Sequence, residues 1–328
     1  MPAHNLLTTL RRRAAGLGRR IVLPEGEDPR VQEAARSAVE LDLARPVLVS
    51  QGASPGPGVE VLRPEEDRRL PLYAERLAAS PLSRGRSAES LHERLKDPLF
   101  YACALVKEGR ADAAVMGAVA TTASTLRAAL GVIGVDPRYG VVTSCFLMEL
   151  PDRVMVYADC GVVPQPTAEQ LADIAMQAAE SYRHRVGGEP IVALLSFSTL
   201  GSARHGALEP VLAAREILRE RNVDFLVDGE LQADAALVPA VASRKAADSP
   251  VAGRANVLVF PDLNSGNIAY KITERLAGAR AIGPLLQGLA LPVHDLSRGC
   301  SSEDILDTMA IAALDAESMA RHDPRRQA

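Results

Sequence analysis

Residues 20–50, RIVLPEGEDPRVQEAARSAVELDLARPVLVS, contain one complete β-α-β unit. Two short apolar runs, at 20–23 and 46–50, flank a segment at 29–43 whose apolar residues recur at helical spacing. Parallel strands need a crossover of this length between them, and the crossover is usually a helix. The stretch therefore predicts a parallel sheet covered by helices.

The same alternation continues along the chain and predicts an α/β fold. One segment differs: at 140–160 two apolar runs are joined by the short polar turn PDR, which predicts a hairpin. Further strands are expected at 111–119, 191–198, 223–231 and 255–263, with helical patterns at 99–110, 122–133, 167–186, 208–221 and after 302.

The chain has 328 residues, which is more than one domain usually contains, so two lobes are expected. We place the lobe boundary at the predicted hairpin. The first lobe is expected at 1–145 plus 297–328, because the last helix of such proteins commonly returns to the first lobe, and the second lobe at 146–296.

The composition limits the classes of function. Hydrophobic residues make up 47% of the chain, with only 3% aromatic residues and no Trp, so the core is aliphatic, as in parallel α/β sheets. The net charge of −4 argues against a nucleic-acid surface, which needs clustered Lys and Arg. No apolar run approaches the ~20 residues that cross a bilayer. The basic segment 1–20 is interpreted as an amphipathic helix rather than a transit peptide.

The cysteines predict neither a zinc site nor a disulfide framework, because they are far apart and form no CxxC pair. A reducing cytoplasm fits this usage, and we expect no bound metal. The four residues are Cys103, Cys145, Cys160 and Cys300.

Polar residues follow several predicted strands, where ligands bind in open α/β sheets. Small and hydroxyl residues at 120–125 precede Arg127, a combination that can hold an oxyanion. A second hydroxyl-rich loop follows the strand at 191–198. Each segment also fits an ordinary capped helix, so none decides the function alone.

Three acids, Asp228, Glu230 and Asp234, lie close together after another strand. Carboxylates at this spacing can bind a divalent metal. One alternative is therefore a metal- and NAD(P)-dependent dehydrogenase, although no His or Cys ligand and no cluster of substrate-binding arginines stands beside these acids.

The stretch DLSRGCSSED at 295–304 allows two interpretations. Ser301 or Ser302 followed by acids is an ordinary helix start. Alternatively, it is an active-site turn in which Arg298 and the helix N-terminus hold an anion while Ser297 or Asp304 handles a proton.

Three longer segments resemble the phosphate acetyl/butyryltransferase family, and its phosphate acetyltransferases in particular. They are SFSTLGSARH at 196–205, the run from DGELQADAAL to AYKITERL at 228–276, and GPLLQGLALPVHDLSRGCSSEDIL at 283–306. Looser matches at 21–31, 97–118 and 121–130 extend the resemblance over nearly the whole chain.

This resemblance implies reversible transfer of an acetyl group between CoA and inorganic phosphate. It also implies a two-lobed α/β fold like that of the isocitrate and isopropylmalate dehydrogenases, with mostly parallel sheets, helices on both faces and the active site in the interdomain cleft. A cytoplasmic homodimer without nucleic-acid or membrane partners is expected. CoA is then a substrate, and no permanently bound cofactor is expected.

Carried over residue by residue, the resemblance implies that Ser297, Arg298 and Asp304 are catalytic. Arg127 and Thr125 are expected to bind phosphate or acyl phosphate together with Arg298. The residues expected to bind CoA or to line the cleft are Ser198, Thr199, Ser202, Asn264, Asn267, Lys271 and Cys300.

The chain departs from the family pattern in two places. Where the family often has His and Asp before the arginine and Pro after it, this chain has Ala120, Ser124 and Ala128. A further arginine of the family has no clean match, because the interval 73–86 resembles an insertion. Its candidates are Arg76, Arg84 and Arg86.

These residues suggest a mechanism. A free thiol with a pKa of about 8.5 is mostly protonated at neutral pH, so a base must remove its proton, and a partly desolvated Asp304 fits that role. Arg298 and Arg127 can offset the charge of the acyl phosphate, and Ser297 can donate to the oxyanion. An acyl-enzyme on Cys300 is the alternative chemistry; direct transfer is preferred.

Two alternative functions remain open within this resemblance. The chain is then a phosphate acyltransferase that prefers propionyl or butyryl groups, or a non-catalytic sensor of acetyl-CoA.

Overall fold

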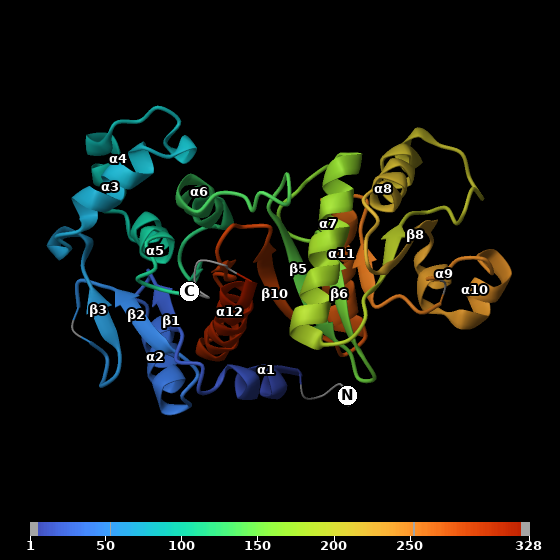
Figure 1. The fold of residues 1–328 in the computed structure, drawn as a ribbon. Coiled ribbons are helices and arrows are strands. Elements are labelled where there is room, and N and C mark those ends of the chain that lie inside the picture. Colours follow the sequence, from blue (N-terminus) through green and yellow to red (C-terminus); the bar gives the residue numbers. More distant parts are fainter. Residues whose placement is uncertain (1–5, 53, 252, 323–328) are drawn as a thin grey trace. The chain divides into compact units, whose positions relative to one another are not determined.

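The computed structural model describes residues 6–52, 54–251 and 253–322. The chain divides into two compact units, coloured along the sequence in Figure 1. We name the units by their place in the sequence. The outer unit comprises residues from Leu7 to Asp136 and from Leu289 onward, and the central unit comprises Pro137–Gly288, the middle of the chain. The sequence analysis places the two changes of lobe later, at 145/146 and 296/297. The first of those positions lies inside a strand of the central unit, and the segment 289–296 contributes a strand to the outer unit.

The outer unit contains a five-stranded sheet in the order β11-β4-β1-β2-β3, and every pair in it is parallel. The strands of the opening β-α-β unit are therefore confirmed as parallel neighbours. The strands are β1 (Arg20–Leu23), β2 (Arg45–Val49), β3 (Glu60–Leu62), β4 (Ala113–Met116) and β11 (Val293–Asp295).

Several helices of the outer unit begin where the sequence supplies a capping side chain. Asp28 caps α2, Asp97 caps α5 and Thr121 caps α6, each accepting a hydrogen bond from a backbone N–H of the first turn. The last helix packs on α2 and β4. The helices are α1 (Leu6–Ala14), α2 (Pro29–Glu40), α3 (Leu70–Ala78), α4 (Ala88–Arg94), α5 (Pro98–Lys107), α6 (Thr122–Val132) and α12 (Ser302–His322).

The central unit contains a six-stranded sheet in the order β10-β5-β6-β9-β7-β8. The predicted hairpin is confirmed, because β5 and β6 pair antiparallel, and β10 adds a second antiparallel edge. The remaining pairs are parallel. The strands are β5 (Thr143–Glu149), β6 (Val154–Ala158), β7 (Ile191–Leu195), β8 (Leu226–Leu231), β9 (Val257–Val259) and β10 (Arg280–Gln287).

The helices of the central unit cover this sheet and complete an aliphatic core with few aromatic residues. One helix is held by an aromatic contact, since the rings of Phe146 and Tyr270 stack with centroids 3.9 Å apart. The helices are α7 (Ala168–Ser181), α8 (Glu209–Glu220), α9 (Ala233–Leu237), α10 (Pro239–Lys245) and α11 (Leu263–Leu276). The predicted α/β fold is thus confirmed.

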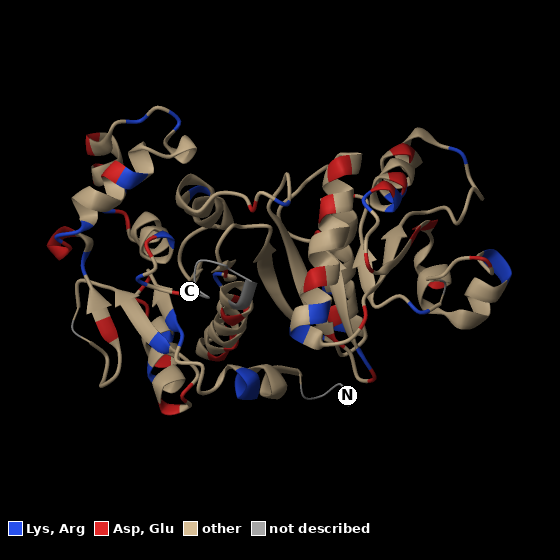
Figure 2. Ribbon diagram, in the orientation of Figure 1, with Lys and Arg blue, Asp and Glu red and all other residues tan. Residues whose placement is uncertain are grey.

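Acidic and basic side chains are interspersed on the helices of both units (Figure 2), in keeping with the small net charge of −4. No helix within the described ranges has the length and apolar character needed to span a membrane.

Candidate active site

The turn between β11 and α12 presents the first two predicted catalytic residues. Ser297 and Arg298 are both exposed, whereas Asp295 and Leu296 before them are buried. The turn is closed locally, because the Cys300 N–H donates to the carbonyl of Ser297 at 2.9 Å. The Arg298 guanidinium makes no hydrogen bond or ion pair with any described residue, so it is free to bind an anion.

Asp304 lies at the start of α12 and is exposed. Its carboxylate accepts from the Ser301 N–H at 2.9 Å and from Ser301 Oγ at 2.8 Å, and its own N–H donates to Ser301 Oγ at 3.1 Å. This reciprocal pairing is a helix-capping arrangement. The capping interpretation of the stretch 295–304 is therefore correct for Ser301 and Asp304. Ser297 takes no part in this cap; its Oγ accepts from the Gly299 N–H at 3.3 Å, while the Arg298 side chain has no partner among the described residues.

Cys300 lies beneath the same turn and is 7% exposed. Its Sγ is 4.0 Å from Nη1 of Arg30. Burial raises the pKa of the thiol, which the positive charge of Arg30 offsets only in part. The surroundings of Cys300 therefore favour the neutral thiol over the thiolate.

Thr125 is fully buried in α6, at 0% exposure, so its hydroxyl is closed off from solvent. This burial argues against the predicted phosphate contact. Thr125 Oγ1 and Asp295 Oδ1 both lie without a hydrogen-bond partner among the described residues, while Thr122 Oγ1 donates to Asp295 Oδ2 at 2.6 Å. Burial raises the pKa of Asp295. The hydrogen bond from Thr122 fastens α6 to the end of β11.

Arg127 is exposed on α6, two positions after the buried Thr125. Successive residues of a helix are 100° apart, so the two side chains point to nearly opposite sides of α6. The same side of the helix as Arg127 carries Gly131, where Phe100 packs closely. The Arg94 guanidinium lies over that Phe100 ring, 4.2 Å from its centroid.

Three arginines therefore gather beside α6. The pKa of Arg94 is lowered, first by burial and then by the positive charges of Arg86 and Arg127, and Asp97 offsets this in part. None of the three guanidinium groups makes a hydrogen bond or an ion pair with the part of the chain that the structure describes. Closely spaced cations without carboxylate partners favour the binding of an anion.

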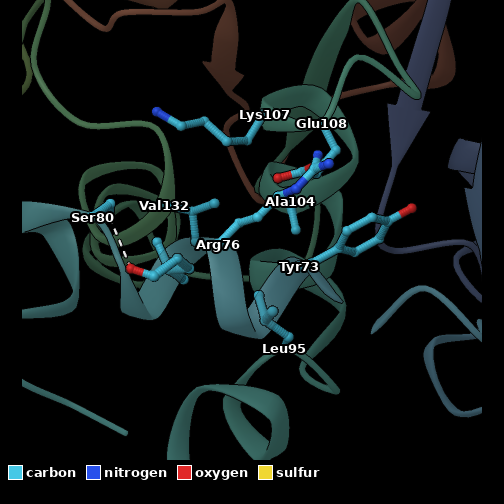
Figure 3. Close-up of a pocket in the computed structure, with 9 residues that line it drawn as sticks. Tyr73, Arg76, Ser80, Leu95, Ala104, Lys107, Glu108 and Val132 are labelled. Carbon is cyan, nitrogen blue, oxygen red and sulfur yellow. Dashed lines mark hydrogen bonds and ion pairs between the residues drawn. The ribbon is translucent and has the colours of Figure 1, made fainter. Parts of the chain in front are cut away.

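The other two candidates for the additional arginine are differently placed. Arg84 is exposed, with a left-handed backbone. Arg76 forms an ion pair with Glu108, and both side chains line a small cavity of about 60 Å³ (Figure 3). Of the three candidates, only Arg86 joins the group that contains Arg127. The cavity is lined by Tyr73, Arg76, Leu77, Ser80, Leu95, Ala104, Lys107, Glu108 and Val132.

Two of the hydroxyls expected to contact CoA are buried in the central unit and make hydrogen bonds there. Ser198 is 0% exposed and its Oγ donates to Glu230 at 2.8 Å, while Thr199 is 4% exposed and its Oγ1 accepts from the Gln232 N–H at 3.0 Å. They fasten the loop after β7 to β8. Ser202 is exposed, although its Oγ accepts from the Thr199 N–H at 3.0 Å.

The predicted residues of α11 differ in accessibility. Asn267 is partly buried and donates from Nδ2 to the carbonyl of Cys160 at 3.1 Å. Asn264 and Lys271 are exposed, and Nζ of Lys271 lies 4.8 Å from the centroid of the Tyr270 ring. Asn264 and Lys271 are thus the two of this set that can reach a ligand.

The three acids considered as metal ligands have separate partners. Glu230 is buried under Ser198, Asp234 forms an ion pair with Lys245 at 2.8 Å, and Asp228 lies 3.9 Å from Arg215. Within the described ranges, no group of three or more His, Cys, Asp or Glu side chains is arranged to hold a metal ion. The geometry therefore gives no support to the metal-dependent dehydrogenase alternative.

The sequence analysis missed two residues that contact the Ser297–Cys300 turn or its neighbouring loop. Glu25 and Arg30 follow β1 and bind backbone groups far away in the sequence. The stretch PEGEDPR was the available signal, but it also fits the start of a capped helix, and Asp28 does cap α2.

Comparison with known proteins decides the family. Residues 5–313 match the phosphate acetyl/butaryl transferase family. The chain belongs to this family. It is 50% identical over 307 residues to a phosphate acetyltransferase of Paracoccus denitrificans, covering 92% of this chain and 96% of that protein.

Solved structures agree with this membership. A phosphotransacetylase from Streptococcus pyogenes is 39% identical and superposes with a TM-score of 0.90, covering 97% of this chain and 100% of that one. A 4-hydroxythreonine-4-phosphate dehydrogenase from Klebsiella pneumoniae, 13% identical, covers 90% of this chain and 99% of its own with a TM-score of 0.51. That likeness concerns the fold alone, and it agrees with the dehydrogenase-like fold expected from the resemblance.

Proposed function

We propose that this chain is a phosphate acetyltransferase, which transfers an acetyl group reversibly between CoA and inorganic phosphate. One observation carries the proposal: a hydroxyl, an unpaired guanidinium and a carboxylate, those of Ser297, Arg298 and Asp304, are all exposed around one helix start. The similarity to named phosphate acetyltransferases over most of the chain supports it. CoA is a substrate in this reaction rather than a resident cofactor.

The exposed groups divide the chemistry between them. In the direction that produces acetyl-CoA, the CoA sulfur forms a bond to the carbonyl carbon of acetyl phosphate, and the thiol proton passes to Asp304. The bond from that carbon to the phosphate oxygen then breaks. Arg298 binds the phosphate and stabilises it as it leaves. Ser297 donates to the oxyanion of the tetrahedral intermediate, a contact worth about 3–4 kcal/mol where measured.

The position of Asp304 adds one requirement. Because its carboxylate is exposed, we infer that the arriving CoA excludes water from it. Desolvation favours the protonated form of a carboxylate and so makes it a better base. Binding of CoA and activation of its thiol are coupled in this scheme.

The arginine group beside α6 supplies the second phosphate contact in the proposal. Arg127 binds phosphate or acyl phosphate as expected, and Arg86 takes the place of the additional arginine of the family because its charge acts on the same group. Thr125 is left out of this contact, since it is buried.

A thiol-release assay tests the function. Acetyl-, propionyl- and butyryl-CoA are each incubated with the protein, with and without phosphate. Phosphate-dependent release of CoA that is fastest with acetyl-CoA supports the proposal. Fastest release with a longer acyl group would make the chain a different phosphate acyltransferase, and no phosphate-dependent release would mean that it is not a transferase of this type.

The role of Asp304 is tested by Asp304→Asn, which keeps an oxygen that can accept from Ser301 but removes the base. We expect kcat to fall by at least about 100-fold with little change in the KM for CoA. Glu303→Ala is the control, because Glu303 is a neighbouring exposed acid whose side chain pairs with Arg11. An Asp304→Asn variant with normal kcat would remove Asp304 from the mechanism.

We further propose that the protein is a cytoplasmic homodimer. Support for a dimer comes from α11, whose exposed residues Ile268, Ile272 and Leu276 are spaced one turn apart and form an apolar stripe.

A further inference from the structure

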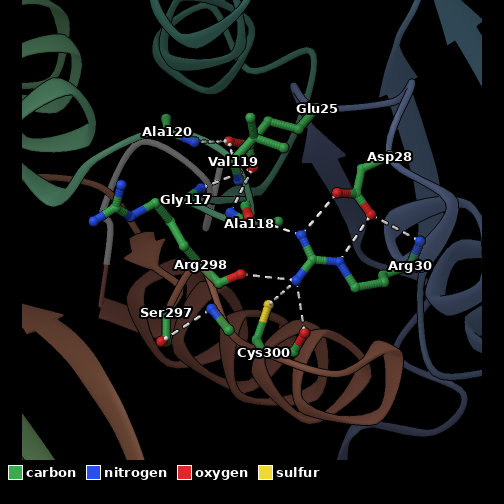
Figure 4. Close-up of polar contacts among 11 residues, drawn as sticks. Glu25, Asp28, Arg30, Gly117, Ala118, Val119, Ala120, Ser297, Arg298 and Cys300 are labelled. Atoms are coloured by element: carbon green, nitrogen blue, oxygen red, sulfur yellow. Dashed lines mark hydrogen bonds and ion pairs between the residues drawn. The ribbon is translucent and has the colours of Figure 1, made fainter.

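The loops after β1, β4 and β11 lie next to one another, because these strands are neighbours in the outer sheet and all run parallel. The loop after β11 carries Ser297 and Arg298, and the loop after β4 leads into α6. Figure 4 shows how Glu25, in the loop after β1, and Arg30, in the first turn of α2, contact both of these loops.

Glu25 binds the loop after β4 through its backbone. Its carboxylate accepts from the N–H groups of Gly117, Ala118, Val119 and Ala120, at 2.9, 2.8, 2.9 and 2.7 Å. Four convergent amides form a site for one anion. The protein fills that site with its own carboxylate, so these amides are fastened to β1 and are not available to a substrate phosphate.

Arg30 binds the other two loops. Its Nη1 donates to the carbonyls of Arg298 at 2.9 Å and Cys300 at 2.8 Å, and its Nη2 donates to the carbonyl of Ala118 at 2.8 Å. The remaining contacts go to Asp28, from Nε at 3.0 Å and from Nη2 at 2.7 Å.

These contacts use every donor of Arg30, because a guanidinium has five N–H groups. Hydrogen bonding to Arg30 lowers the pKa of Asp28, which therefore stays charged and holds the guanidinium in place. Arg30 has no donor left for a phosphate. It differs in this respect from Arg298, whose guanidinium is unpaired although its carbonyl is held.

We infer that Glu25 and Arg30 are positioning residues, which fasten the Ser297–Cys300 turn and the 117–120 loop to the end of β1 so that Ser297 and Arg298 meet the substrates in a fixed geometry. The inference rests on the proposed function for its catalytic consequence. A misplacement of about 1 Å can cost about 100-fold in rate, so the contacts act on kcat rather than on binding.

The first test measures kcat and KM for Glu25→Gln, Arg30→Met and Arg30→Lys. Glu25→Gln keeps the shape of the side chain but weakens the four contacts. We expect kcat to fall at least about tenfold in Glu25→Gln and Arg30→Met, with the KM values for CoA and acetyl phosphate within about threefold of wild type. Arg30→Lys should recover only part of kcat, because an ammonium group cannot reproduce the planar fork.

Arg20→Met is the matched control. Arg20 lies at the other end of β1, where its Nη2 donates to Glu60 at 2.7 Å and its Nε to the carbonyl of Arg110 at 2.9 Å. The Arg20→Met variant loses a similar set of contacts in the same unit, and its kcat should equal that of wild type. The Arg30→Ala variant provides a further readout. Adding free guanidinium ion to the assay should raise its kcat towards the wild-type value.

A second measurement does not depend on turnover. Amide hydrogen exchange at 117–121 and 296–301 should accelerate in Glu25→Gln and Arg30→Met but not in Arg20→Met. Unchanged exchange in both variants would overturn the inference. So would an unchanged kcat, or a raised KM at normal kcat, which would make Arg30 a substrate-binding residue. An inactive wild type would refute the proposed function, and the exchange result would still decide the role of these two residues.

Discussion

Cys300 shares its turn with Ser297 and Arg298, yet its surroundings disfavour an acyl-enzyme. Burial raises the pKa of its thiol, so little thiolate is present at neutral pH. Cys300→Ala should therefore keep kcat within about threefold of wild type, since removing Sγ leaves the hydrogen bond from Arg30 to the backbone carbonyl in place. The measurement is steady-state turnover, together with mass spectrometry after incubation with labelled acetyl phosphate. A labelled acetyl group on Cys300 would replace direct transfer with a covalent route.

Asp295 lies under the same turn and gives a prediction about stability. Burial raises its pKa above that of the unfolded chain, so the folded protein binds more protons, and the free energy of unfolding falls as pH rises above about 4. Asparagine does not titrate, and it keeps an oxygen that accepts from Thr122. The melting temperature of Asp295→Asn, relative to wild type, should therefore increase between pH 4 and pH 7. A difference that stays constant across this range would contradict the raised pKa.

At the scale of elements, periodicity predicted the β-α-β unit at 20–50, the hairpin at 140–160 and the helix after 302, because each has a local pattern. It did not predict β10, where Gly283 and Pro284 interrupt the apolar run, or β3, which is only three residues long. A regular apolar pattern reveals an element that buries the same face along its whole length. Short edge strands and interrupted strands are stabilised by their neighbours in the sheet.

The residues of the candidate site could be predicted only where they lie within one short segment of the sequence. Resemblance placed Ser297, Arg298 and Asp304 at an exposed helix start. The hydroxyl residues after the predicted strands also suggested Thr125 and Ser198 as ligand contacts, and both are buried. A hydroxyl after a strand serves equally well as a cap, a core contact or a ligand, and packing decides between these roles.

Glu25 and Arg30 show the other limit of sequence reasoning. In the other two loops, the partners of Glu25 are 92 to 95 residues away along the chain, and those of Arg30 are 88, 268 and 270 residues away. No local pattern encodes contacts between loops that meet only because β11, β4 and β1 are adjacent in the sheet. These contacts follow from the strand order, which the alternation of strands and helices does not specify.

At the scale of the whole molecule, α11 carries apolar surface that is exposed among the described residues. Of its residues only Gly266 is buried, and Ile268, Ile272 and Leu276 are 56%, 52% and 82% exposed. An apolar stripe of this kind is typical of an interface between subunits. Because the wild-type side chains are already exposed in the isolated chain, a charge placed there should cost little folding stability.

Ile272→Glu is therefore expected to convert a dimer into a monomer, since the interface would have to bury an unpaired carboxylate. Light scattering coupled to size-exclusion chromatography, at several micromolar concentrations, measures the mass directly. Leu72→Glu is the control, because Leu72 is an apolar residue of similar exposure, 42%, on α3 of the outer unit. A monomeric wild type would refute the dimer, and a dimer that persists in Ile272→Glu with unchanged affinity would place the interface elsewhere on the surface.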